Sequence, residues 1–225
     1  MDYLFLSNTV LFHGITPPEV KEMLLCLRAE TKSYRRGEVI LRAGDTVSSV
    51  GLVLSGSVSV ENDDVWGNKS ILDRVQPGQV FAETYACVPG APLMISAVAA
   101  ENAEILFLDM SRVLYPCSNA CGFHNKLVRN LLSIASQKNL NLSRRIFHTS
   151  SKSIRGRLLS YLSFQSLQQG SREFDIPFNR QQLADYLSVD RSALSNELSK
   201  MQRDGLIRVD RNHFRLLSVD PADTF

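Results

Sequence analysis

The hydrophobic periodicity changes once along this chain, and the change limits the folds that are open to it. From Gly37 to Leu108, short segments alternate apolar and polar residues between turn sequences such as WGN and QPGQ. A period of two with regularly spaced turns predicts an antiparallel β-roll, or jelly roll. After Asp109 the apolar residues recur at helical spacing, so helices are expected there. The sequence therefore predicts an α+β protein whose β domain comes first.

The length of 225 residues suits two domains, each with its own core. A content of 44% hydrophobic and 21% charged residues is typical of a globular protein and excludes a disordered or fibrous one. No apolar run reaches the ~20 residues of a membrane-spanning helix, and the start MDYLFLSNTV does not resemble a signal peptide. We therefore expect a cytoplasmic protein with no membrane partner, whose four cysteines stay reduced.

The sequence TPPE predicts the start of a short helix over residues 16–28. Thr16 suits the N-cap, Pro17 the first helical position and Glu19 the capping box. Cys26 lies next to the apolar stripe of this helix, and we expect it to pack against the core. The residues expected to face inward are Val20, Met23, Leu24 and Leu27.

A long helix is predicted between Cys121 and Thr149, because its apolar residues largely follow a spacing of four and then three. So narrow a seam is typical of a helix that contacts another chain, and a polar Asn139 inside it would pair with its own copy in a parallel homodimer. Packing within one chain is the alternative. Residues 149–153, TSSKS, form the expected hinge. The candidate dimerisation residues are Val128, Leu132, Ala135, Asn139, Leu142 and Ile146.

Residues 174–217 contain the motif that points to a function. Asn179 and Gln182 suit a helix cap, LSV forms a turn, and Asp190 suits the cap of a second helix that ends near Arg203. The segment LIRVDRNHFRLL predicts two short strands around DRN. Two capped helices and a hairpin together predict a winged helix-turn-helix. The apolar residues expected in its core are Leu183, Ala184, Leu187, Leu194, Leu198 and Met201.

The opposite side of the second helix carries small polar residues and one arginine, which a DNA major groove admits. Arginine can bind guanine, asparagine can bind adenine, and serine can bind phosphates or base edges. The region from residue 144 onward has 13 Lys and Arg against 9 Asp and Glu, a balance compatible with nucleic-acid binding. A packed helical pair that binds no DNA is the alternative. The candidate DNA-binding residues are Arg191, Ser192, Ser195, Asn196, Ser199, Arg180, Arg208 and Arg211.

The order of β-roll, long helix and winged helix-turn-helix resembles the bacterial CRP/FNR family of transcription regulators over nearly the whole chain. RRGEVILRAGD, GLVLSGSVSV and QPGQVFAE are similar to strands of that family's cyclic-nucleotide-binding-like β-roll, and RQQLADYLSVDRSALSNELSKMQRDGLI is similar to its DNA-reading segment. The resemblance implies a sensor domain over residues 1–115, a dimerisation helix and hinge over 116–150, and a winged helix-turn-helix over 151–225. It also implies a homodimer that binds double-stranded DNA at a palindromic operator under the control of a small-molecule effector.

By this similarity, Arg191, Ser192 and Asn196 occupy the three positions that usually contact bases. Family members of the cyclic-AMP and FNR types commonly carry glutamate and arginine at the second and third of these positions. Ser188 also replaces a frequent turn glycine. We therefore expect an operator that differs from the consensus of either type.

The segment FAETYACVPGAPLMISAV lies where cyclic-nucleotide binders of this family resemble one another in a phosphate-binding cassette. Alignment keeps the glutamate as Glu83 and the serine as Ser96, but puts Ala82 at the glycine and Ile95 at the arginine. The sequence has no arginine or lysine from residue 75 to residue 111, so a phosphate would lack a cationic partner. We expect an uncharged or apolar effector of unknown identity and not cyclic AMP. The candidate pocket residues are Glu83, Thr84, Met94, Ile95, Ser96 and Leu142.

A second sensor type of the family resembles an iron–sulfur protein with N-terminal cysteines, but here no cysteine precedes Cys26. Cys117, Cys121 and His124 fall on one face if the long helix covers all three. Two thiolates and an imidazole suit zinc or a haem iron, and Cys117 near a helix N-terminus suits a thiol switch. Simple packing, with His124 bound to a carbonyl, is the third possibility. The sequence alone names no cofactor.

Other classes of protein fit less well. A cyclic-nucleotide-binding-like module that acts on a protein partner would share the β-roll but would not need the C-terminal hairpin. An enzyme is not expected, because no Gly-rich phosphate loop, HExxH or GxSxG motif is present.

Overall fold

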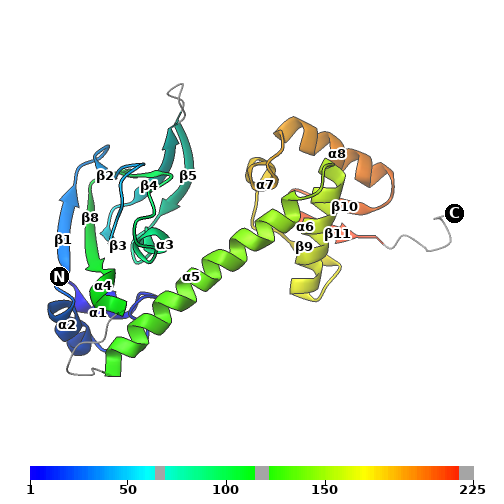
Figure 1. Ribbon diagram of the computed structural model, residues 1–225. Helices are drawn as coiled ribbons and strands as arrows, with labels where there is room; N and C mark the ends of the chain where they lie inside the picture. The colour runs from blue at the N-terminus through cyan, green and yellow to red at the C-terminus, as the bar shows by residue number, and fades with distance from the viewer. Residues whose placement is uncertain (64–68, 115–121, 218–225) are drawn as a thin grey trace. The chain divides into compact units, whose positions relative to one another are not determined.

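The computed structural model describes residues 1–63, 69–114 and 122–217 (Figure 1). The chain divides into two compact units, Met1–Gln137 and Lys138–Phe225. No helix in the described part of the chain is long and apolar enough to cross a membrane.

The first unit contains two four-stranded antiparallel sheets, and the alternating pattern predicted such strands over residues 37–108. The strand Glu30–Tyr34 lies before that range and was not predicted. One sheet has the order β1-β8-β3-β6 and the other the order β2-β7-β4-β5. Apolar residues of both sheets form one core cluster. The strands are β1 (Glu30–Tyr34), β2 (Val39–Leu41), β3 (Ser49–Ser55), β4 (Val58–Asp63), β5 (Lys69–Val75), β6 (Val80–Phe81), β7 (Ser96–Ala99) and β8 (Ala103–Asp109).

The helices α1 to α4 and the first turns of α5, whose bounds are given below, form a second core cluster with β3 and β8. The Glu19 carboxylate accepts the Thr16 N–H at 2.7 Å, so the capping box begins α2 as predicted. Leu27 is fully buried, but Cys26 is exposed, and the expectation that Cys26 packs is wrong. At 100° per residue, Cys26 falls outside the buried stripe. The helices are α1 (Tyr3–Ser7), α2 (Pro17–Cys26), α3 (Glu83–Ala86), α4 (Met110–Leu114) and α5 (Gly122–Thr149).

One tight turn in this unit requires glycine. Gly56 has φ +72°, and a Cβ there would lie 2.2 Å from the Asn102 carbonyl oxygen. Any side chain at this turn would displace the neighbouring backbone, so the turn between β3 and β4 depends on Gly56.

The second unit packs α6, α7 and α8 against a three-stranded sheet of order β10-β11-β9. Gly170 ends α6 in the left-handed conformation. The core contains the six residues predicted from the helical pattern, all at most 2% exposed. The elements are α6 (Ile154–Gln169), β9 (Glu173–Asp175), α7 (Arg180–Leu187), α8 (Arg191–Arg203), β10 (Ile207–Asp210) and β11 (His213–Leu216).

Candidate DNA-binding surface and sensor site

The helices α7 and α8 begin at the caps that the sequence predicts. The Asn179 side chain accepts the Gln182 N–H at 3.0 Å, and the Gln182 side chain accepts the Asn179 N–H at 2.9 Å. The Asp190 carboxylate accepts the N–H of Ser192 at 2.7 Å and of Ala193 at 3.1 Å. The Ser192 hydroxyl also donates to this carboxylate, and that bond, followed by the two N–H bonds, lowers the pKa of Asp190 and keeps it ionised.

The exposed side of α8 carries the predicted base-reading residues. Arg191, Ser192, Asn196 and Ser199 are exposed, and Ser195 is half-buried. The Ser195 hydroxyl donates to the Arg191 carbonyl at 2.9 Å, and the Ser199 hydroxyl donates to the Ser195 carbonyl at 3.0 Å. The Ser192 hydroxyl donates to Asp190. Because their protons are used locally, these serines present acceptor lone pairs, whereas Arg191 presents only donors.

The hairpin of β10 and β11 forms the wing, with Asp210 opposite His213. Arg208 lies on β10 and Arg211 in the turn, and both are exposed. Arg180 is half-buried, and its guanidinium carbon lies 5.4 Å from the centre of the Phe214 ring. Burial lowers the pKa of Arg180. Arg180 therefore contributes to packing as well as to surface charge.

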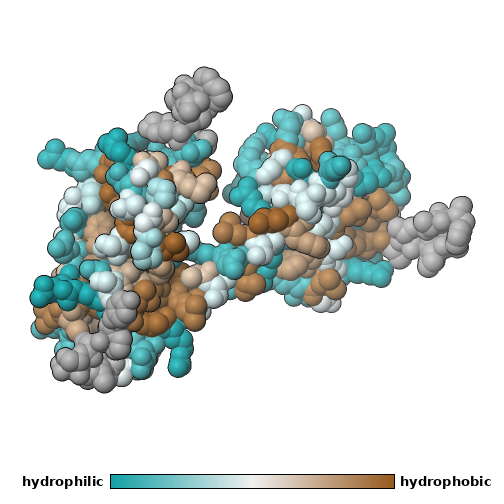
Figure 2. Space-filling model, viewed as in Figure 1, coloured by the Kyte–Doolittle hydropathy of each residue, from teal (hydrophilic) through white to brown (hydrophobic). Residues whose placement is uncertain are grey.

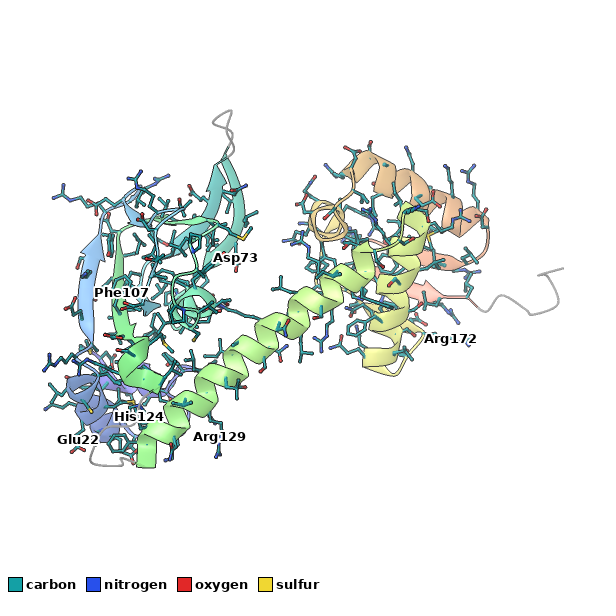
Figure 3. The ribbon with its side chains drawn as sticks, in the orientation of Figure 1. Glu22, Asp73, Phe107, His124, Arg129 and Arg172 are labelled. Carbon is teal, nitrogen blue, oxygen red and sulfur yellow. The ribbon has the colours of Figure 1, made fainter. Side chains whose placement is uncertain are left out.

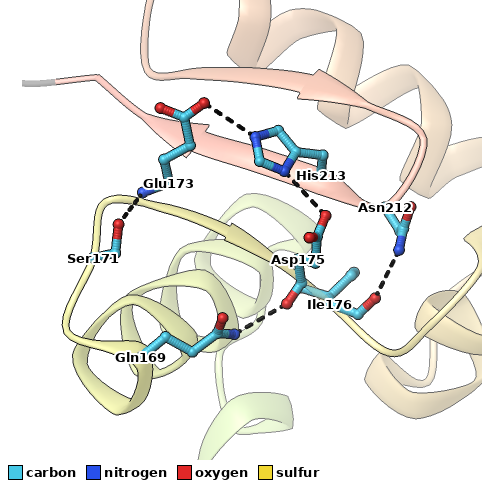
Figure 4. Close-up of polar contacts among 7 residues, drawn as sticks. All are labelled: Gln169, Ser171, Glu173, Asp175, Ile176, Asn212 and His213. Atoms are coloured by element: carbon cyan, nitrogen blue, oxygen red, sulfur yellow. Dashed lines mark hydrogen bonds and ion pairs between the residues drawn. The ribbon is translucent and has the colours of Figure 1, made fainter.

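Polar side chains join the wing to β9, as Figure 4 shows. His213 Nδ1 lies 3.0 Å from Asp175 Oδ1, and its Nε2 lies 3.1 Å from Glu173 Oε1. These two carboxylates, with Glu173 the stronger influence, raise the pKa of His213. The Asn212 amide donates to the Ile176 carbonyl at 3.3 Å. A protonated His213 therefore ties the wing to the adjacent strand.

Two arginines hold the helix-turn-helix in place, and the sequence pattern did not identify them. Arg157 donates to the carbonyls of Ser151, Leu187 and Ser188 at 2.8, 3.0 and 2.9 Å. The Arg155 guanidinium lies 2.6 Å from the carboxylate of Glu197, on α8, and 2.7 Å from that of Asp204, at the end of α8. Except for Ser151, these partners lie 30 or more residues away along the chain, so no local spacing signals them.

The candidate sensor segment begins with a residue in an unusual conformation. Ala82, at the position of the family's glycine, has φ 63° and ψ 8° and precedes the single turn of α3. Glu83 follows it and is 4% exposed. The Ser96 hydroxyl accepts the Ala43 N–H at 3.0 Å. The local backbone shape that glycine favours is thus kept by an alanine.

The other candidate pocket residues differ in exposure. Thr84 is exposed, Ile95 is half-buried and Met94 is 78% exposed. The Met94 N–H donates to the Tyr85 hydroxyl at 3.4 Å. Leu142 belongs to the second unit and is 61% exposed on α5.

His124 is buried near the start of α5 (Figure 3), and its Nε2–H donates to the Val113 carbonyl at 2.7 Å. This is the carbonyl contact that the sequence left as one of three possibilities. Cys117 and Cys121 lie outside the described residues. Within residues 1–63, 69–114 and 122–217, no three His, Cys, Asp or Glu side chains come together as a metal site.

Comparison with known proteins covers both units. The family described as "Cyclic nucleotide-binding domain" matches residues 31–117, and "Crp-like helix-turn-helix domain" matches residues 156–221. The cyclic AMP receptor protein of Thermus thermophilus is 26% identical over 91% of this chain and 90% of its own length. The transcriptional activator FnrA of Stutzerimonas stutzeri is 25% identical over 83% of this chain and 76% of its own. The chain belongs to the CRP/FNR family of transcription regulators.

The fold of this CRP/FNR protein is similar to a solved family structure. The crystal structure of the Thermus thermophilus catabolite activator protein has a TM-score of 0.51 at 23% identity and covers 92% of this chain and 93% of its own. The relatives are DNA-binding transcription regulators. The CRP/FNR protein is therefore a regulator with a DNA-binding helix-turn-helix domain, and not an enzyme.

CRP/FNR regulators bind DNA and act as dimers, which directs attention to the seam on α5. Leu132 is 65% exposed and Ile146 69% exposed in the single chain. Asn139 is exposed between them, while Val128 and Ala135 are half-buried. In Figure 2, brown hydrophobic atoms reach the surface beside the path of this helix. A seam of exposed apolar residues around one asparagine is what a second helix would cover.

Proposed function

We propose that this CRP/FNR protein is a homodimer that binds a palindromic DNA operator through α8 and is controlled through its β-roll by a small uncharged molecule. The exposed face of α8 carries the DNA part of the proposal. Arg191 supplies donors for guanine, and Asn196 supplies one donor and one acceptor for adenine. The three serines supply acceptors for amino groups on base edges.

The homodimer rests on the seam of α5. Leu132, Leu142 and Ile146 would bury their exposed side chains against the same residues of a second copy, and Asn139 would pair with its own copy. Two copies present two α8 helices, and half-sites ~34 Å apart accommodate such a pair in successive major grooves. An effector that moved the paired helices would change this spacing and so change DNA affinity.

The uncharged effector rests on the charge of the sensor segment. No arginine or lysine occurs from residue 75 to residue 111. Ile95 stands where a phosphate-binding arginine would, so an anionic phosphate would lose its charge-assisted hydrogen bonds in this site. A neutral molecule that bonds Glu83 and Ser96 avoids that cost.

DNA binding is tested by selecting an operator from random duplexes and measuring affinity by electrophoretic shift. Arg191→Ala should weaken specific binding by about 1 to 3 kcal/mol, or roughly 5- to 150-fold. Arg172→Ala, at an exposed arginine away from α8 (Figure 3), is the matched control and should bind as the wild type does. Tight operator binding by Arg191→Ala would refute the role of α8.

The effector is tested by calorimetric titration of the full chain with cyclic AMP. We expect no saturable binding to the wild type, because the phosphate has no cationic partner. Ile95→Arg should create weak binding, while Ile95→Gln, which adds a polar side chain without charge, should not. Tight binding of cyclic AMP by the wild type would refute the uncharged effector.

Control by a metal, haem or thiol through Cys117, Cys121 and His124 is the second candidate. Native mass spectrometry with elemental analysis of freshly purified protein tests it. A stoichiometric metal or haem, or a reversible mass change on oxidation, would support this second candidate over the small-molecule effector. The mass of the apoprotein both before and after oxidation would exclude the second candidate.

A further inference from the structure

A cavity of about 290 Å³ lies in the second unit, away from the exposed face of α8. It is formed by the C-terminal turns of α5, by α6, by the segment before α7 and by α7 itself. Neither DNA binding nor sensing by the β-roll uses it. The volume is near the lower end for small-molecule sites, which suits a ligand of one ring.

Aromatic rings belong to half of the residues that line the cavity. The His148 ring centre lies 5.5 Å from that of Tyr161 and 5.2 Å from that of Phe164. The Tyr186 ring centre lies 5.4 Å from that of Tyr161 and 5.1 Å from that of Phe178. Rings at these separations pack against one another, and all of them line the cavity, so a planar aromatic ligand would have ring contacts there.

Two of these wall residues bury a polar atom without a hydrogen bond. His148 is 1% exposed and Tyr161 is 2% exposed. Among the described residues, His148 Nε2 and the Tyr161 hydroxyl have no hydrogen-bond partner. Burial raises the pKa of Tyr161, so its hydroxyl stays protonated and able to donate. An unpaired buried polar group is costly, and a ligand atom bonded to either would remove the cost.

The charged residues that line the cavity favour a ligand with a negative charge. The lining residues include one cation, Arg144, and no acidic residue. The Arg144 guanidinium lies 5.4 Å from the Phe164 ring centre, and its contact with Asn141 is long at 3.5 Å. Arg145, one residue on, donates instead to backbone carbonyls of α7 at 3.1 and 3.2 Å. Arg144 is therefore the cation placed to receive an anionic group at this cavity.

We propose that this cavity binds a small planar aromatic carboxylate, with its ring among Tyr161, Phe164 and Tyr186 and its carboxylate on Arg144. The ligand joins the end of α5 to α6 and α7, the first helix of the DNA-binding motif. It therefore acts on the DNA-binding unit directly, independently of any effector in the β-roll.

The test is calorimetric titration of the full-length protein with benzoate and with benzamide, which share a shape and differ in charge. Benzoate should bind with a dissociation constant of about 1 mM or below. Benzamide should bind about tenfold more weakly, because the charge-assisted contact with Arg144 is lost. Benzoate should also shift the NMR signals of the His148 imidazole.

Variants locate the binding. Arg144→Gln should weaken benzoate about tenfold and leave benzamide unchanged, while Phe164→Leu should weaken both ligands through lost stacking. Arg172→Gln, at an exposed arginine outside the cavity, should change neither. Absence of benzoate binding to the wild type, or equal binding by wild type, Arg144→Gln and Phe164→Leu, would overturn the proposal. The calorimetric titration contains no DNA, so a failure to bind benzoate would overturn only the cavity proposal. The DNA-binding proposal is tested separately by operator binding without benzoate.

Discussion

His148 Nδ1, in the last turn of α5, lies 2.9 Å from the hydroxyl oxygen of Tyr186 in α7. The two residues are 38 positions apart in sequence, and His148 is 1% exposed. This contact and the bonds from Arg145 to the carbonyls of Asp185 and Tyr186 attach the first helix of the DNA-binding motif to the end of α5. These contacts hold α7 against the end of α5.

Removal of the Tyr186 hydroxyl should destabilise the second unit. Tyr186→Phe leaves both ring nitrogens of the buried His148 unpaired, so we expect a loss of about 1 to 3 kcal/mol in the free energy of unfolding, measured by urea denaturation. Tyr85→Phe is the matched control, because the Tyr85 hydroxyl accepts only a long bond of 3.4 Å. Equal losses in the two variants would show that the His148 contact is not the cause.

Replacement of Arg157 by lysine should also destabilise this unit. The Arg157 guanidinium binds the carbonyl of Ser151, before α6, and the carbonyls of Leu187 and Ser188, where α7 ends, and an ammonium group cannot span all three. We expect Arg157→Lys to lower the free energy of unfolding by about 1.5 to 3 kcal/mol in urea denaturation. Arg155→Lys should cost less, because its carboxylate partners are within reach of solvent. The reverse order would contradict this account.

The turn between α7 and α8 should become more stable with glycine. Ser188 is exposed and has φ 54° and ψ 52°, a left-handed conformation that costs a residue with a Cβ about 1 kcal/mol. Ser188→Gly should therefore raise the thermal unfolding midpoint. Ser199→Gly, within α8, should lower it, since glycine destabilises a helix interior. A decrease for Ser188→Gly would mean that the serine side chain has a stabilising contact of its own.

The stability of the wing should depend on pH through His213. Its pKa is raised in the folded protein by Glu173 and Asp175, so the protonated form is bound more tightly when folded. The stabilisation is fully present below the unfolded pKa of about 6.5 and is lost as pH rises through the higher folded value. The free energy of unfolding of the wild type minus that of His213→Gln, measured by urea denaturation across this pH range, should therefore decrease as pH rises. A difference that is constant or grows with pH would exclude the linkage.

Much of the fold was predictable from residues that are close in sequence. The period of two between Gly37 and Leu108 predicted the β-roll, and the caps at Asn179 and Asp190 predicted the starts of α7 and α8. The predicted inward residues of α8 are buried. These succeed because side-chain periodicity and capping act within a few residues. The candidate base-reading residues were found in the same way and remain a prediction about DNA contacts.

The sequence alone thus determined where α2, α7 and α8 begin and which of their faces are apolar, because those properties are local. Only the tertiary structure decided which distant groups meet: His148 with Tyr186, Arg157 with Ser188, and His213 with Glu173. It also decided that Cys26 is exposed and that Ala82 keeps a backbone shape suited to glycine. Such contacts depend on how whole elements pack, and packing brings together residues whose separation along the chain carries no periodic signal.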